Sequence, residues 1–153
     1  MKIALACDHG ALELKEAIKA HLEQKGLVCE DFGTYTKDSC DYADFAAPAA
    51  RAVASGECER GIVCCTTGIG ISIAANKIKG IRCALLHEHI SARLTRQHNN
   101  ANMMALGAAV TTIPTALELV DIFLNTEFEG GRHQRRIDMI AAIEDGTFTD
   151  ETV

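Results

Sequence analysis

The chain has 153 residues, which fits one domain with enough interior for a full hydrophobic core. Apolar residues make up 48% of it and charged residues 24%, which excludes a disordered or fibrous chain. The formal net charge of −6 disfavours nucleic acid and membranes as partners, so an anionic ligand would need a local cluster of basic side chains.

The apolar pattern predicts five strands that alternate with helices. Short apolar runs predict strands at 2–7, 27–33, 61–65, 81–86 and 103–110. Helical periodicity predicts helices within 8–26, 41–56, 70–78, 88–98, 114–125 and 135–146. Parallel strands need crossover connections, so the pattern indicates an α/β fold: a three-layer α/β/α Rossmann-like domain with a five-stranded parallel sheet. We expect one domain over 1–153, with a flexible acidic tail at about 146–153.

The stretch "GIVCCTTGIGISIAANK" joins the third strand to a helix. Ligands of open parallel sheets gather at the carboxyl ends of strands, and Gly68 and Gly70 would let several N–H groups face one point there. Cys65 would lie beside those groups, a place that favours thiolate and suits a base or nucleophile. The alternative is a plain tight turn over core cysteines, and strand alternation favours a core position for Cys64.

Other polar side chains lie near strand ends. Asp8 and His9 follow the first strand and could hold a polyol and a phosphate, or could simply cap the next helix. His98, Asn99 and Asn102 precede the fifth strand, where they could recognise hydroxyls or an oxyanion, or form an ordinary turn.

The segment "GGRHQRR" is the basic cluster that an acidic chain needs for an anionic ligand. Arg132 and Arg136 share a helix face beside His133, so a phosphate between them would offset their repulsion; a solvated basic face is the alternative. A dinucleotide site is disfavoured because "GIGISI" lacks the third glycine of the fingerprint and follows the wrong strand.

The cysteines and the apolar runs bound the cellular setting. Seven cysteines are an odd number, and no C-x-x-C pair is present, which argues against a disulfide framework and structural zinc. The segment "HEH" is not a convincing metal pair either, so we expect no metal site. No apolar stretch reaches the roughly 18–20 residues that span a bilayer, and no signal peptide is evident, so we expect a cytoplasmic protein.

Seven segments together resemble the ribose-5-phosphate isomerase B family, which includes galactose-6-phosphate and allose-6-phosphate isomerases. They are "ACDHGALELK", "DFGTY", "DYADFA", "CCTTGIGISIAANK", "GIRCALLHE", "SARLTRQHNNANMMALG" and "EGGRHQRRI". The resemblance runs over nearly the whole chain. It implies a cofactor-free aldose–ketose isomerase that works through a cis-enediolate and is active as a homodimer, possibly a tetramer, with the site shared between subunits.

The resemblance also implies roles for individual residues. Cys65 would be the base, Thr67 would assist proton movement, and His98 would help to open the cyclic sugar. The remaining residues would bind substrate: Asp8 and Tyr42 the sugar, Asn99 a hydroxyl or oxyanion, the backbone of Gly68, Ile69, Gly70 and Ser72 the enediolate oxygen, and His9, Arg132, His133 and Arg136 the phosphate.

Three departures from the family pattern leave the substrate open. Thr66 replaces a common glycine, Ala109 stands where many members have arginine, and Ile71 stands where one branch has a glutamate base. A six-carbon sugar phosphate is therefore an alternative to ribose 5-phosphate. A non-catalytic phosphosugar-binding partner subunit is the alternative from another class.

Overall fold

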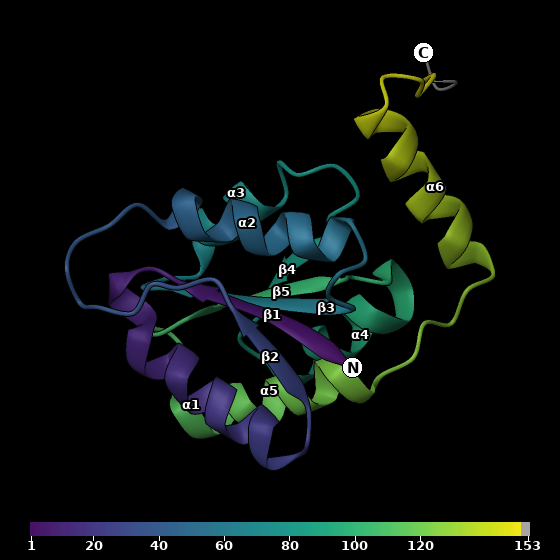
Figure 1. Ribbon diagram of the computed structural model, residues 1–153. Coiled ribbons are helices and arrows are strands. Elements are labelled where there is room, and N and C mark those ends of the chain that lie inside the picture. Colours follow the sequence, from purple (N-terminus) through teal and green to yellow (C-terminus); the bar gives the residue numbers. More distant parts are fainter. Residues whose placement is uncertain (151–153) are drawn as a thin grey trace.

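The computed structural model describes residues 1–150, which form a parallel sheet covered by helices (Figure 1). The strands are β1 (Lys2–Cys7), β2 (Val28–Asp31), β3 (Arg60–Cys65), β4 (Cys83–Leu85) and β5 (Met103–Gly107). The helices are the 3-10 turn η1 (His9–Ala11), α1 (Leu12–Gln24), α2 (Tyr42–Ala54), α3 (Ile69–Ala75), α4 (His89–Asn99), α5 (Ile113–Asn125) and α6 (Arg132–Glu144). This confirms the predicted fold class.

The strand order is β2-β1-β3-β5-β4, and every pair is parallel. The chain continues from β1 to β2 on one side of the sheet and from β3 to β4 on the other, so the order reverses between these two parallel neighbours. Ligands of open α/β sheets bind at such a switch point, beyond the carboxyl ends of the strands. The ends of β1 and β3, at Cys7 and Cys65, therefore mark the first place to look for a site.

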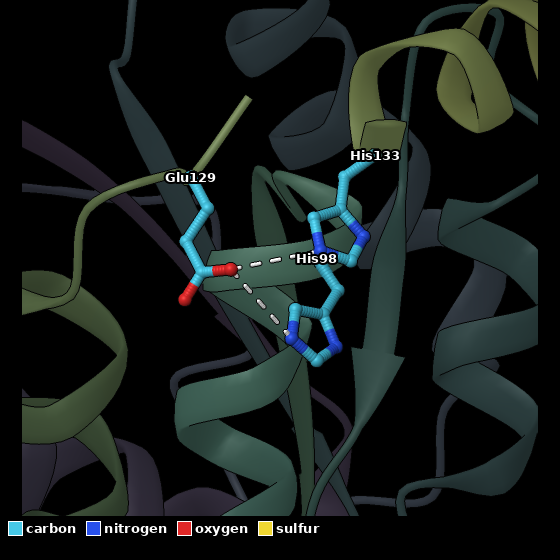
Figure 2. Close-up of side chains that lie close together, drawn as sticks. All are labelled: His98, Glu129 and His133. Atoms are coloured by element: carbon cyan, nitrogen blue, oxygen red, sulfur yellow. Dashed lines mark ion pairs between the residues drawn. The ribbon is translucent and has the colours of Figure 1, made fainter. Parts of the chain in front are cut away.

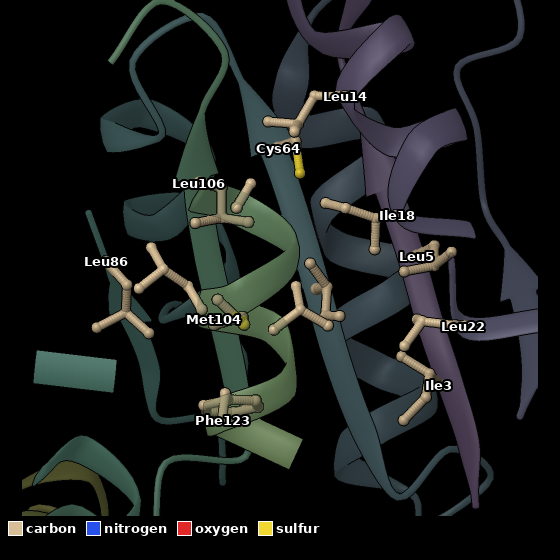
Figure 3. Packing of buried hydrophobic residues seen from close by; sticks show 14 of the residues in the cluster. Ile3, Leu5, Leu14, Ile18, Leu22, Cys64, Leu86, Met104, Leu106 and Phe123 are labelled. Carbon is tan, nitrogen blue, oxygen red and sulfur yellow. The ribbon is translucent and has the colours of Figure 1, made fainter. Parts of the chain in front are cut away.

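Two hydrophobic clusters cover the two faces of the sheet. Side chains of β1, β3 and β5 alternate between them, and Figure 3 shows the cluster under α1 and α5, which contains Ile3, Leu5, Cys64 and Leu106. The opposite cluster, under α2 and α3, contains Cys65. Consecutive cysteines thus enter different layers, and the predicted core position of Cys64 is confirmed.

Several predicted boundaries are wrong: β2, α3 and β4 end earlier than expected, and the differences at β5 and α6 have clear causes. β5 ends at Gly107 instead of residue 110, because the chain turns there and the Thr111 N–H donates to the Gly107 oxygen at 2.9 Å. α6 begins at Arg132 instead of residue 135, since Gly130 and Gly131 take positive φ angles of 66° and 56° that reverse the chain just before it.

The chain's last helix extends away from the sheet and packs against α4 (Figure 1). Beyond it, the Thr147 and Phe148 N–H groups both donate to the Ala142 oxygen, so this part of the predicted flexible tail folds back on α6. Residues 151–153 of that tail lie outside the described residues. Among residues 1–150, none of the helices has the length and apolarity needed to cross a bilayer.

Candidate active site

The loop after β3 wraps around the sulfur of Cys65. The Gly68 N–H donates to the Cys65 Sγ at 3.1 Å, and a donor at this position stabilises negative charge on sulfur. Gly68 has a φ of 77°, and a Cβ there would lie 2.9 Å from the Leu106 carbonyl carbon, so only glycine fits. The Cys65 side chain is buried, with 4% of it exposed. Burial, followed by the Cys7 thiol, raises the pKa of the neighbouring Cys64 well above its usual range.

This loop is fixed against the end of β5. The Ala108 N–H donates to the Cys65 oxygen at 3.0 Å and the Ala109 N–H to the Thr66 oxygen at 2.9 Å. Gly107 lies directly beneath Thr67, because a Cβ at Gly107 would come within 2.5 Å of the Thr67 oxygen. The geometry around the sulfur is therefore set by two strands and does not depend on the loop alone.

Several donors face the space beside the loop. The N–H groups of Gly70 and Ile71 lie in the first turn of α3 and have no hydrogen-bond partner among the described residues. The Thr67 hydroxyl accepts from the Ile69 N–H at 3.3 Å, and the Ser72 hydroxyl donates to the Ile69 oxygen at 2.7 Å. Free N–H groups next to a thiol are the arrangement that an oxyanion intermediate requires.

Asp8 and His9 reach the same edge from the end of β1. The Asp8 N–H donates to the Cys64 oxygen at 3.2 Å, and its carboxylate accepts from the Gly10 N–H at 2.9 Å. The His9 Nδ1 accepts from the Cys40 N–H at 3.2 Å, so the neutral His9 ring carries its proton on Nε2, which can donate to a ligand. Sequence reasoning did not single out Cys40, since no spacing links it to His9.

Two side chains close over glycines at this edge. A Cβ at Gly70 would lie 2.8 Å from the Tyr42 ring, so Tyr42 is part of the same surface, as the family resemblance implies. A Cβ at Gly10 would overlap the Thr66 hydroxyl, which therefore fills space between the ends of β1 and β3. Thr66 is exposed at this edge, at the position where the family resemblance implies glycine.

A second group of predicted residues lies at the other end of the strands, where β5 begins. We call this side the second edge, and the side on which β1 and β3 end the first edge. α4 follows β4 and returns to the start of β5, so His98 and Asn99, at its end, are far from Cys65. The His98 ring stacks on the His133 ring, with centroids 4.2 Å apart and planes 9° from parallel (Figure 2). Arg132 and Arg136 are exposed on the first turns of α6 beside this stack.

Glu129 faces both rings of the stack (Figure 2). Its Oε2 lies 3.6 Å from the His133 Nε2 and 4.0 Å from the His98 Nε2. Burial, followed by the charges of His98 and Arg132, lowers the pKa of His133. Sequence reasoning missed Glu129, although its position four residues before His133 was a usable signal.

The stack, with Glu129, has ligand atoms within 4.8 Å of one another, close enough to consider a metal ion. Metal ligation uses the in-plane lone pair of each imidazole, and the lone pairs of stacked rings run side by side instead of converging. Arg132 and Arg136 add positive charge nearby. The donor set is better suited to sharing a proton than to holding a divalent cation.

A cavity of about 670 Å³ lies beneath α6 at this second edge. Asn99 lines it together with Ile140 and Ile143, which are 47% and 61% exposed. Cys65 does not touch it. We regard it as the consequence of a helix that leaves its apolar side uncovered, because Asn76 and Arg82 in its lining already donate to backbone oxygens of the fold.

Asn102, predicted beside this group, has a structural role. Its Oδ1 accepts from the Arg82 N–H at 2.8 Å, and its Nδ2 donates to the Gly80 oxygen at 2.8 Å. These bonds fix the turn before β4 against the start of β5. The side chain is therefore occupied within the fold.

The fold is Rossmann-like. At the switch point of its parallel sheet, a thiol lies beside free backbone donors, which is an arrangement suited to an enzyme. The family described as Ribose/Galactose Isomerase matches residues 3–140. The chain belongs to this family, and its class of enzyme is isomerase.

Similarity extends over nearly the whole chain. The chain is 48% identical to "Ribose-5-phosphate isomerase B" of Escherichia coli K12, in an alignment that covers 94% of this chain and 96% of that protein. The structure of ribose-5-phosphate isomerase B from Clostridium thermocellum is 49% identical, with a TM-score of 0.94 and coverage of 95% and 99%. A structure from Mycoplasma genitalium "with bound Ribulose-5-phosphate" is 42% identical, with a TM-score of 0.90 and coverage of 94% and 96%.

Proposed function

We propose that this protein interconverts ribose 5-phosphate and ribulose 5-phosphate, without a cofactor, through a cis-enediolate. The relatives' names support the substrate, and the contact that carries the chemistry is the Gly68 N–H bond to the Cys65 sulfur. An aldose–ketose isomerisation needs a base that can hold negative charge next to donors for an oxyanion.

In the proposed reaction the Cys65 thiolate removes the proton from C2 of the open-chain aldose. The electron pair of that C–H bond forms the C1–C2 double bond, and the carbonyl electrons move to O1. The N–H groups of Gly70 and Ile71, with the other backbone donors of the loop, stabilise that oxygen. Return of the proton to C1, with proton movement between the oxygens assisted by Thr67, completes the ketose.

Recognition of the substrate uses residues of both edges. Asp8 and Tyr42 contact the sugar from the first edge, and His9 donates from Nε2 to the phosphate. Arg132 and Arg136 supply the positive charge that a phosphate requires, and Asn99 a hydroxyl contact. The role of His133 as a phosphate contact stays a prediction, since its side chain is buried in the stack.

Cys65 and His98 lie at opposite edges of one chain, so one copy cannot bring both to the same sugar. We therefore propose a homodimer in which the α4 and α6 ends of one copy complete the Cys65 edge of the other. The exposed Met139, Ile140 and Ile143 on α6 support this, because a helix that projects with uncovered apolar side chains indicates a partner surface. Tetramer formation and a cytoplasmic location stay predictions.

Complementation between inactive variants tests the shared site. Cys65→Ala and His98→Asn should each be nearly inactive, while a refolded equimolar mixture should recover about one quarter of wild-type activity, since half of the dimers carry one intact site. No recovery in mixtures shown to exchange subunits would refute a shared site.

A panel of aldose phosphates, assayed with and without a chelator, tests the substrate and the absence of a cofactor. Faster turnover of a six-carbon phosphate than of ribose 5-phosphate would favour the alternative substrate. Binding without turnover would favour the non-catalytic partner subunit.

A further inference from the structure

Glu129 and His133 form a built environment around His98 that the proposed chemistry leaves unexplained (Figure 2). The Glu129 N–H donates to the oxygen of Gln97, the residue before His98, at 3.0 Å. This bond ties the loop before α6 to the last turn of α4 and holds the carboxylate beside the rings. The cluster thus joins two elements that are distant along the chain.

Only one of the two stacked rings can carry a proton at low cost, since two parallel imidazolium ions at 4.2 Å would repel each other. His133 is 5% exposed and faces the charges of His98, Arg132 and Arg136 as well as Glu129. Burial and these positive neighbours lower its pKa, which disfavours a proton on His133. His98 is only half-buried and keeps access to solvent and ligand.

An aromatic face and a carboxylate each favour a cation beside them. For His98 the His133 ring is the face, and Glu129 Oε2 is the carboxylate oxygen. The same contacts restrict rotation of the His98 ring, so they fix its direction.

We propose that Glu129 and His133 are positioning residues that hold His98 as a protonated, oriented donor. The inference rests on the proposed function, in which His98 opens the cyclic sugar. There the imidazolium gives its proton to the ring oxygen, the bond from C1 to that oxygen breaks, and the proton of the anomeric hydroxyl leaves as the carbonyl forms. Water or a base of the site accepts that second proton.

The charge is tested with Glu129→Gln, which keeps the shape of the side chain, and with Glu127→Gln as the matched control on the same loop. We expect Glu129→Gln to lower the pH midpoint of the His98 ring signals in NMR, because the variant removes the negative charge 4.0 Å from the His98 Nε2. The high-pH limb of kcat/KM should move by the same amount. Glu127→Gln should change neither, and an unmoved midpoint in Glu129→Gln would overturn the proposal.

The stack is tested with His133→Phe, which keeps an aromatic face, and His133→Ala, which removes it. We expect kcat to fall at least tenfold in His133→Ala and to be partly restored in His133→Phe, because a ring that loses its orientation transfers protons poorly. Equal loss in both variants, each shown to be folded, would refute an orienting role. If the wild-type chain turned over no sugar phosphate, the proposed function would fail, while the NMR midpoint would still test the contact between Glu129 and His98.

Discussion

Replacing Cys65 by alanine separates the proposed chemistry from the packing of the core. The variant loses one buried sulfur, and removal of a group of this size costs about 1 kcal/mol of unfolding free energy. A domain of this kind has about 5–15 kcal/mol of stability, so the chain stays folded. Cys64→Ala is a matched control, because Cys64 is the adjacent residue, is buried to a similar degree, and faces the opposite layer.

The two variants should differ sharply in activity. Loss of a general base costs about 10²–10⁴-fold, so Cys65→Ala should reduce kcat by at least a hundredfold, while Cys64→Ala should stay within a few-fold of wild type. The assay is conversion of ribose 5-phosphate to the ketose, with the melting temperature of each variant measured in parallel. Equal activity loss in both variants, or near-normal turnover by Cys65→Ala, would refute the assignment of the base.

Three further outcomes follow from the structure. Thr66→Gly should raise kcat/KM for a six-carbon aldose phosphate about tenfold relative to ribose 5-phosphate, because the obstacle beside Gly10 is worth about 1–3 kcal/mol; an unchanged ratio would contradict this. Lys15→Met should lower the unfolding free energy by about 1–3 kcal/mol at pH 7, since it removes the Nζ at 2.7 Å and leaves the Asp31 carboxylate with only the Lys19 Nζ at 3.2 Å and the Gly33 N–H at 2.9 Å. Burial alone would raise the pKa of Asp31, but hydrogen bonds, first from Lys15, outweigh it and lower the pKa. The stabilisation by this pair is therefore present above about pH 4 and is lost as the pH falls through the folded-state pKa of Asp31. Urea titrations of the wild-type and Lys15→Met proteins should consequently converge in acid. Ile143→Asp should weaken the dimer, and sedimentation that shows unchanged association would place the interface elsewhere.

The alternation of strands and helices was predictable because buried strands have short apolar runs and their crossover helices have a different period. Boundaries were less so. The apolar letters of Ala108, Ala109 and Val110 continue the pattern of β5, yet the chain turns there because its N–H groups bond to the loop after β3. Such a tertiary bond leaves no local signal in the sequence.

The candidate residues were found by type, but their grouping required coordinates. The resemblance implies one site for Cys65 and His98 that is shared between subunits, and only the path of α4 shows that the two residues lie at different edges of one chain. Glu129 was missed because an acidic residue in a loop is ordinary until its partners are seen. The support of Cys65 by Gly107 was also hidden, since that contact joins residues far apart in the sequence.

The distance between the two edges has a kinetic consequence. If each working centre is assembled from two copies, the turnover rate of a highly diluted sample should vary with the square of the amount of polypeptide, and only above the dissociation constant should it become proportional to it. Loss of output on dilution would then report separation of the subunits, without any damage to the individual chain.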